Sequence, residues 1–239
     1  MFIVKNLSKN LGGCPIVQNI NFCLKQGEII ALVGPNGAGK TTLMRCLAGV
    51  YDLDGGAVSV DDITLEDNRE EYLKKLSYVP ETGGLYPEMT VYEYLRFMAA
   101  LKGVDSAERD KQIKRLASEL ELDSVLAQKC ETLSKGYKRR AAVAGAMISN
   151  PPMLILDEPT EGLDPQQKQH FRKLLSAYAA AGNIVLISTH IMEEVAAVGD
   201  RAVLINKGRL IWNAPADELR KLAPDNDMNT AFRLLTGEK

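Results

Sequence analysis

A glycine-rich stretch of nine residues constrains this chain more than any other part of its sequence. Residues 34–42 read GPNGAGKTT and satisfy the pattern G-x-x-x-x-G-K-[S/T] in full. The apolar run of residues 29–33 precedes the stretch, and a helical pattern follows it in residues 43–47. The sequence therefore predicts a strand, a glycine-rich turn and a helix, which is the context of a phosphate-binding loop.

The residue types of this loop suit a nucleoside triphosphate with Mg²⁺. Because glycine lacks a Cβ atom and adopts positive φ, the backbone can wrap around phosphate oxygens, and N–H groups at the helix start point at the anion. Lys40 is expected to reach the β- and γ-phosphates, and the Thr41 hydroxyl to bind Mg²⁺. The alternative, a glycine turn with Lys40 in solvent, requires a chance match to the whole pattern. The loop residues predicted to bind nucleotide are Gly34, Pro35, Asn36, Gly37, Ala38, Gly39, Lys40, Thr41 and Thr42.

Composition excludes several classes of protein. Hydrophobic residues make up 46% and charged residues 25% of the 239 residues, which is a globular balance, and the net charge of −2 gives no overall case for nucleic-acid binding. The four cysteines and two histidines show no zinc-ligand spacing. No apolar run reaches the roughly 18–20 residues of a membrane helix, and no signal sequence begins the chain. We therefore expect a cytoplasmic protein with reduced cysteines, no nucleic-acid partner and no direct insertion into the membrane.

The order of apolar runs and amphipathic segments predicts an α/β fold. Strands are predicted at residues 2–7, 16–24, 29–33, 57–60, 76–79, 153–157, 184–188, 202–206 and 209–212. Helices are predicted at residues 41–48, 90–122, 135–149, 165–181, 191–198 and 215–222. The alternation after residue 150 indicates a parallel sheet with crossover helices, and the helical block between the two halves indicates an inserted subdomain. Residues 223–239 are expected to form a weakly ordered tail or a small helix.

Two carboxylates at the end of an apolar strand form a second candidate site. Asp157 and Glu158 follow the run of residues 153–156 directly. In open α/β sheets, ligands bind beyond the C-terminal ends of the strands, so both acids should lie near the phosphate loop. Asp157 is expected to hold Mg²⁺, directly or through water, and Glu158 to act as general base on the attacking water. The alternative is that the two acids simply begin a polar loop. That alternative does not explain why the same chain also has a complete phosphate loop.

Two further residues allow both a structural and a chemical interpretation. His190 follows the apolar strand and either contacts the γ-phosphate and the attacking water or starts a helix behind a Ser/Thr cap. Asp164 precedes Pro165 and fits a helix N-cap, which does not exclude a second role. The residues alone leave both alternatives open.

Taken together, these segments resemble the ATP-binding subunit of an ABC transporter, over roughly residues 2–222. Residues 133–137 (LSKGY) stand where the family has its LSGGQ signature, at the start of a predicted helix. Residues 156–160 (LDEPT) resemble the Walker B strand with its catalytic glutamate, and residues 161–164 (EGLD) resemble the D-loop. Thr189-His190 is similar to the switch-histidine motif.

The resemblance implies a P-loop NTPase fold of the ABC type, with a mixed parallel sheet core, an N-terminal antiparallel β-subdomain and an inserted α-helical subdomain. Residues 1–222 would form the ATPase domain, and residues 223–239 a C-terminal tail. Within the domain, residues 1–85 and 150–222 would form the catalytic core, and residues 86–149 the helical subdomain with the signature motif. ATP and Mg²⁺ are the implied cofactors, and Lys40, Glu158 and His190 the implied catalytic residues.

The resemblance also implies two kinds of partner. A second ATP-binding subunit, identical or different, would pair head to tail, and Ser134 and Gly136 would close over the γ-phosphate bound by the other subunit, with Asp164 also at the nucleotide. An integral membrane permease would dock on the helical insert, so that the protein works as a peripheral ATPase on the cytoplasmic face of the cell membrane. The alternative is a soluble ABC-type ATPase that acts on ribosomes or DNA, but the long coiled coil or second nucleotide domain of such proteins is missing.

Three departures from the family pattern refine the expectation. Lys135 and Tyr137 replace signature residues as in ABC-2 exporters, which favours export. Glu81 stands at the Q-loop position, where many members have glutamine, and its carboxylate can still bind Mg²⁺. Leu11 stands where an aromatic ring usually stacks on adenine. Because an aliphatic side chain covers the base without ring stacking, a contribution of order 1 kcal/mol is lost and the choice between ATP and GTP stays open.

Overall fold

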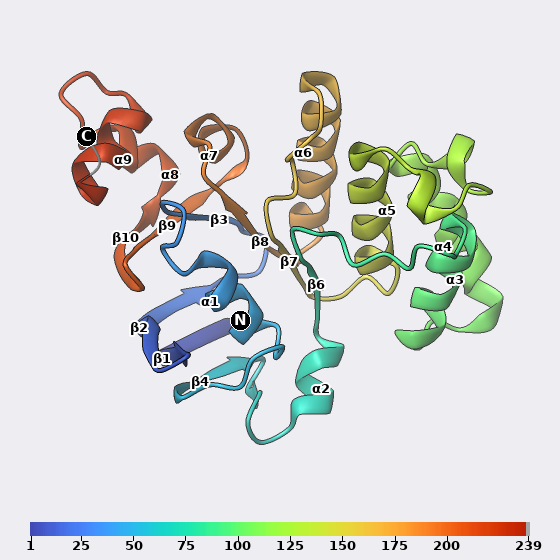
Figure 1. Ribbon diagram of the computed structural model, residues 1–239, viewed down its shortest axis with the longest axis horizontal. Helices are drawn as coiled ribbons and strands as arrows, with labels where there is room; N and C mark the ends of the chain where they lie inside the picture. Colours follow the sequence, from blue (N-terminus) through green and yellow to red (C-terminus); the bar gives the residue numbers. More distant parts are fainter. Residues whose placement is uncertain (238–239) are drawn as a thin grey trace.

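The structure, a computed structural model, describes residues 1–237 as two β-sheets with helices packed around them (Figure 1). The strands are β1 (Phe2–Leu11), β2 (Cys14–Leu24), β3 (Ile29–Val33), β4 (Gly55–Val60), β5 (Ile63–Thr64), β6 (Leu76–Val79), β7 (Met153–Leu156), β8 (Ile184–Thr189), β9 (Arg201–Asn206) and β10 (Arg209–Pro215). The helices are α1 (Lys40–Leu47), α2 (Arg69–Lys74), α3 (Val91–Leu101), α4 (Ser106–Glu119), α5 (Lys135–Met147), α6 (Pro165–Ala180), α7 (Met192–Val198), α8 (Ala216–Arg220) and α9 (Met228–Thr236). Every strand and helix predicted from the sequence has a counterpart among these elements.

The larger sheet places β3 between two parallel neighbours. Its strand order is β10-β9-β3-β8-β7-β6, and all of its strands run parallel except β10, which pairs antiparallel with β9. The smaller sheet is antiparallel, with order β2-β1-β4-β5. The predicted α/β fold, with a mixed parallel core and an N-terminal antiparallel unit, is confirmed. The glycine-rich loop leaves β3 at the centre of the larger sheet, where the ends of neighbouring strands can surround it.

Side chains of the larger sheet divide between two hydrophobic cores because successive residues of a strand point to opposite faces. In β3, Ile30 and Leu32 pack with α1 and the antiparallel sheet, whereas Ile29, Ala31 and Val33 pack with the outer helices. All five residues are buried. Burial on both faces explains why this strand reads as a continuous apolar run instead of an alternating one.

The predicted helical insert forms a separate group at one side of the molecule, next to β6 (Figure 1). Its first helix begins with the predicted capping box, in which Thr90 and Glu93 exchange side-chain and backbone hydrogen bonds. The predicted single block of residues 90–122 is divided into α3 and α4, since Gly103 adopts a φ of 73° just after α3. The partition of the chain into a catalytic core and a helical subdomain stays a prediction.

The structure adds detail to the predicted elements in two regions, around β5 and α2 and at the C-terminus. Strand β5 and helix α2 were not predicted. Helix α2 has a single buried residue, Tyr72, so it carries no apolar periodicity. At the C-terminus, the small-helix alternative holds, because α9 packs against α7 and α8 and buries Met228 and Ala231. The last two residues of the predicted tail, 238–239, lie outside the described residues. Within residues 1–237, no helix combines the length and the apolar character needed to cross a membrane.

Two adjacent glycines of β4 allow a test of how closely this strand approaches the backbone of β1. Gly56 adopts a φ of 84°, and a Cβ atom there would lie 2.3 Å from the carbonyl oxygen of Lys5. Gly55 has no such contact, because the nearest atom is the Ser8 Cβ at 3.8 Å. We predict that Gly56→Ala lowers the free energy of unfolding by about 1–3 kcal/mol, which is the cost of a strained backbone. Urea denaturation measures this free energy. The matched variant Gly55→Ala should change it by less than about 0.5 kcal/mol, and equal effects would contradict this account.

Candidate functional site

The glycine-rich loop between β3 and α1 is held in shape by close backbone contacts. A Cβ atom on Gly34 would lie 2.3 Å from the carbonyl oxygen of Ile205, and one on Gly39 would lie 2.9 Å from that of Ile16. Gly39 also adopts a φ of 103°, which side chains disfavour. These positions therefore require glycine, and the loop is fixed by its neighbours on β2 and β9.

Lys40 folds back across the loop that carries it. Its side chain is buried, and its ammonium group donates hydrogen bonds to the carbonyl oxygens of Gly34 (2.6 Å) and Pro35 (3.2 Å). The lysine charge is thereby placed beside the backbone N–H groups at the start of α1. The loop combines a helix N-terminus and a fixed cation, which is an arrangement that binds phosphate.

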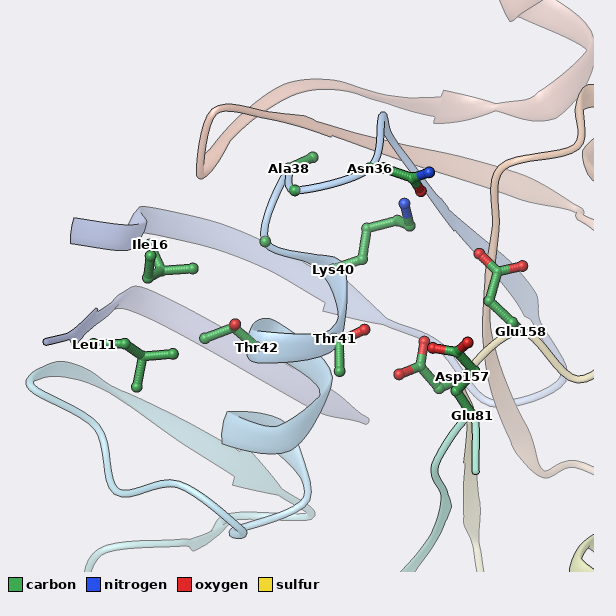
Figure 2. A pocket seen from close by; sticks show the side chains of 12 residues that line it. Leu11, Ile16, Asn36, Ala38, Lys40, Thr41, Thr42, Glu81, Asp157 and Glu158 are labelled. Carbon is green, nitrogen blue, oxygen red and sulfur yellow. The ribbon is translucent and has the colours of Figure 1, made fainter. Parts of the chain in front are cut away.

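A pocket of about 330 Å³ lies in front of this loop. Figure 2 shows that it has two chemically different ends. Leu11 and Ile16 form an apolar end, and the carboxylates of Glu81, Asp157 and Glu158 gather at the other end beside Thr41 and Lys40. The complete lining consists of Leu11, Ile16, Asn36, Gly37, Ala38, Gly39, Lys40, Thr41, Thr42, Glu81, Asp157 and Glu158. The pocket therefore offers an apolar surface for a base at one end and a polar cradle for phosphates at the other.

Asp157 has one carboxylate oxygen that no group of the described chain satisfies. Its side chain is 1% exposed, and Oδ1 accepts a hydrogen bond of 2.6 Å from the Ser188 hydroxyl. Oδ2 is buried and has no hydrogen-bond partner within residues 1–237. A buried carboxylate oxygen without a partner is costly unless something binds it, so this residue fits Mg²⁺, directly or through water. No cluster of three or more His, Cys, Asp or Glu side chains suited to a metal occurs in the same described range.

Glu158 differs sharply from its neighbour in sequence. It adopts a left-handed φ of 48°, and its N–H donates to the Ser188 hydroxyl at 2.8 Å. Its Oε1 lies 3.0 Å from Nδ1 of His190. Burial raises the pKa of Glu158, and the His190 hydrogen bond opposes that shift. A carboxylate with a raised pKa that lines the pocket suits the role of a general base. Lys40 lines the same pocket and His190 contacts Glu158, so the three predicted catalytic residues lie in one region.

Five of the residues predicted to bind nucleotide lie outside the lining of this pocket, namely Gly34, Pro35, Ser134, Gly136 and Asp164. Gly34 and Pro35 still belong to the loop, because their carbonyl oxygens accept hydrogen bonds from Lys40. His190 is also outside the lining and contacts Glu158, which lines the pocket. Ser134 caps α5, since its hydroxyl accepts a hydrogen bond from the Tyr137 N–H at 3.4 Å. Asp164 caps α6 through a capping box with Gln167, which confirms the helix-start interpretation. Both caps are exposed to solvent, and their contact with a nucleotide stays a prediction.

No sequence pattern marks three residues that shape the site, namely Ile16, Ser188 and Arg139. Ile16 gave no signal beyond its place in a strand, and Ser188 looked only like a residue before a helix. A short basic run such as residues 135–140 is usually a solvated helix face, but Arg139 and Arg140 are only 4% and 5% exposed. Their burial depends on carbonyl groups far away in the sequence, so local composition could not reveal it.

Comparison with known proteins identifies the family. The family model described as ABC transporter matches residues 17–161, which is more than half of the chain. The chain belongs to the ABC transporter family. A solved structure described as "Structure of ATP binding subunit of ABC transporter" superposes with a TM-score of 0.91 at 30% identity, and covers 98% of this chain and 99% of that one. The chain is thus an ATP-binding ATPase domain of the ABC type.

Relatives of this ABC protein differ greatly in length. The SkfA peptide export ATP-binding protein SkfE of Bacillus subtilis (strain 168) is 37% identical over 210 residues, which is 87% of this chain and 86% of that protein. Cholesterol transporter ABCA5 of Rattus norvegicus is 36% identical over 193 residues, but the match spans 12% of its length. The dimeric structure of a post-hydrolysis state of the ATP-binding cassette MJ0796 bound to ADP and Pi gives a TM-score of 0.82 at 27% identity, and covers 90% of this chain and 99% of that one.

The Ser188 hydroxyl allows a test of how the two carboxylates are held in this ABC protein. It is fully buried and joins the Asp157 carboxylate to the Glu158 N–H. We predict that Ser188→Ala lowers the free energy of unfolding by about 1–3 kcal/mol, because it leaves a buried carboxylate oxygen and a partly buried N–H unsatisfied. Ser77 is also buried, but its hydroxyl has no hydrogen-bond partner in residues 1–237. Ser77→Ala should therefore be within about 0.5 kcal/mol of wild type in the same denaturation experiment, and a Ser188 effect no larger than that would contradict the prediction.

Proposed function

We propose that this chain is the ATP-hydrolysing subunit of a membrane transporter and powers a separate integral membrane permease. The observation that carries the proposal is that Lys40 and Glu158 line one pocket in front of the phosphate loop while His190 contacts the Glu158 carboxylate at 3.0 Å. Export is the proposed direction, since the names of two similar Bacillus subtilis proteins, SkfA peptide export ATP-binding protein SkfE and Linearmycin resistance ATP-binding protein LnrL, concern peptide export and resistance. LnrL is 34% identical over 211 residues, which is 88% of this chain and 68% of that protein.

The two ends of the pocket suggest how ATP lies in it. The base would cover Leu11 and Ile16, and the triphosphate would follow the loop toward Lys40. Mg²⁺ would be held by Thr41, Asp157 and Glu81, and would supply neutralisation of phosphate charge. The unsatisfied Oδ2 of Asp157 supports this assignment.

Hydrolysis would then depend on the Glu158 carboxylate and on its contact with His190. Glu158 would accept a proton from the attacking water while the bond between the β–γ bridging oxygen and the γ-phosphorus breaks and ADP leaves with the bridging oxygen. His190 would orient the Glu158 carboxylate through the contact of 3.0 Å and stay close to the γ-phosphate. Lys40 would stabilise charge on the transferred phosphoryl group, since it is already fixed beside the loop.

A second ATP-binding subunit would complete the site. Ser134 and Asp164 cap their helices at positions exposed to solvent, so both remain accessible to another subunit. Gly136 packs near Gly162 and Leu163, which places the signature and the D-loop next to each other on one surface. We propose that this surface covers the γ-phosphate held by a partner cassette in a head-to-tail dimer, and the match to dimeric cassette structures supports this arrangement.

The helical insert offers an exposed aromatic and aliphatic surface for the permease. Tyr86, Phe97 and Leu101 are 46%, 38% and 65% exposed, and the rings of Tyr86 and Phe97 meet edge to face with centroids 5.3 Å apart. Clustered exposed apolar side chains indicate an interaction site. We propose that the permease docks here and holds the subunit on the cytoplasmic face of the membrane.

The proposed base gives the first functional prediction. Glu158→Gln removes the proton acceptor but keeps the shape, so we expect ATP hydrolysis to fall by about 100-fold or more while ATP affinity changes little. Light scattering should show an ATP-bound dimer accumulating in this variant. Glu119→Gln, an exposed acid of α4 paired with Arg115, is the matched control and should hydrolyse ATP normally. A Glu158→Gln protein with the wild-type rate would show that Glu158 is not the base.

The proposed docking surface of Tyr86, Phe97 and Leu101 gives the second functional prediction. A tagged wild-type protein should copurify with an integral membrane protein after mild detergent extraction. The double variant Phe97→Glu, Leu101→Glu should lose this partner but keep its ATPase rate as an isolated subunit, because charges are costly in an apolar interface. Leu234→Glu, at a residue of α9 that is 62% exposed on the opposite side of the molecule, is the control and should keep the partner. Recovery of the wild-type protein alone, or with ribosomes or DNA, would contradict the transporter role.

A further inference from the structure

The guanidinium group of Arg139 connects three separate segments of the chain inside the protein. Nη1 donates to the carbonyl oxygen of Pro80 at 2.9 Å, and Nη2 donates to those of Glu81 at 3.0 Å and Glu158 at 2.9 Å. The side chain is 4% exposed and belongs to α5, two residues after Tyr137. A planar fork of donors that meets backbone carbonyls fixes the loops themselves, independently of where their side chains point.

The backbone of Glu158 needs such support. A glutamate with a φ of 48° occupies a sparsely populated conformation, which persists only where surrounding contacts determine it. Both backbone polar groups of Glu158 are held by side chains, the N–H by Ser188 and the carbonyl by Arg139. Ser188 in turn donates to the Asp157 carboxylate, so this contact joins two neighbouring residues that both line the pocket. Arg139 is therefore the contact through which a different element, α5, acts on the backbone of residue 158.

We propose that Arg139 is a positioning residue that holds Glu158 in its left-handed conformation and links that conformation to the placement of α5. The inference rests on the proposed ATPase function and deepens it. Because α5 begins directly after Ser134, a shift of this helix would move the signature residues and the carbonyl of Glu158 together. The same guanidinium holds the carbonyls of Pro80 and Glu81, so the loop after β6 takes part in the same movement.

The next residue along the helix provides a natural comparison. Arg140 is 5% exposed, and its guanidinium donates to the carbonyl of Leu120 at 3.1 Å and pairs with the Glu121 carboxylate at 2.8 Å. It also lies over the Tyr137 ring, 4.4 Å from the centroid. All of these contacts stay within the helical insert. The two arginines therefore share residue type, helix and burial but act on different parts of the molecule.

The test compares Arg139→Met with Arg140→Met in the full chain. Methionine keeps the unbranched shape of the side chain and removes all donors. Because a misplaced general base costs rate more than binding, Arg139→Met should lower kcat by about 100-fold and leave the KM for ATP within about threefold of wild type. Arg140→Met should keep kcat within about threefold of wild type, even where its melting temperature falls.

Amide hydrogen exchange supplies a readout that does not depend on turnover. In Arg139→Met, exchange should become faster in residues 80–84 and 157–161, the two segments that lose their anchor. In Arg140→Met, it should become faster around residues 118–122 instead. A wild-type protein without ATPase activity would refute the proposed function, whereas the exchange comparison would still decide whether Arg139 holds residue 158.

Three results would overturn the inference. The first is an Arg139→Met protein with kcat within about threefold of wild type, and the second is a loss of kcat that Arg140→Met reproduces in full. The third is unchanged exchange in residues 157–161. If Arg139→Met does not fold, the pair Arg139→Gln and Arg140→Gln replaces the methionine pair, since the glutamine amide retains one hydrogen-bond donor. The same three results would then overturn the inference.

Discussion

Burial of β3 on both faces fixes where every functional group of this protein lies. A strand that is apolar on both sides can only occupy the middle of the sheet, where it pairs with β8 and β9. The parallel register then aligns the ends of neighbouring strands, with Val33 opposite Thr189 and Leu156 opposite Ile187. The polar residues that follow these strands must therefore meet at one edge of the sheet, in front of α1. The position of the pocket therefore follows from how the strands pack, and the catalytic residues occupy a place that the sheet determines.

The same edge shows how two adjacent carboxylates receive different tasks. Asp157 continues directly from a buried strand, keeps one oxygen on a hydroxyl and presents the other without a partner, which suits a cation. Glu158 turns away through a left-handed backbone and meets a histidine, which suits proton transfer. Their separation depends on backbone geometry at one residue. The groups that hold the backbone of Glu158, Ser188 at its N–H and Arg139 at its carbonyl, therefore bear on this separation although neither lines the pocket.

Sequence reasoning reached the parts of the structure that local pattern controls. The phosphate loop, the buried strands and the caps at Thr90 and Asp164 could be predicted because glycine conformation, side-chain periodicity and cap chemistry act over a few residues. Arg139 could not be predicted, because a buried guanidinium is indistinguishable in sequence from a solvated one until its distant carbonyl partners are known. Helix α2 could not be predicted for a related reason. Its one buried residue, Tyr72, donates from its hydroxyl to the carbonyl of Leu47, and Arg69 donates to the carbonyl of Gly49, so distant backbone groups hold the helix.

The contact between Lys40 and its own loop has a consequence for the energetics of nucleotide binding. Since the ammonium group already donates to the carbonyls of Gly34 and Pro35, an arriving phosphate exchanges partners with those carbonyls or shares the cation with them. The affinity gained at this residue is therefore a difference between two favourable states, smaller than the charge of the lysine suggests. In return, the cation is ordered before the ligand arrives, so little side-chain entropy is lost on binding. A loop built in this way gains less from new hydrogen bonds of its lysine and loses less side-chain entropy when nucleotide binds.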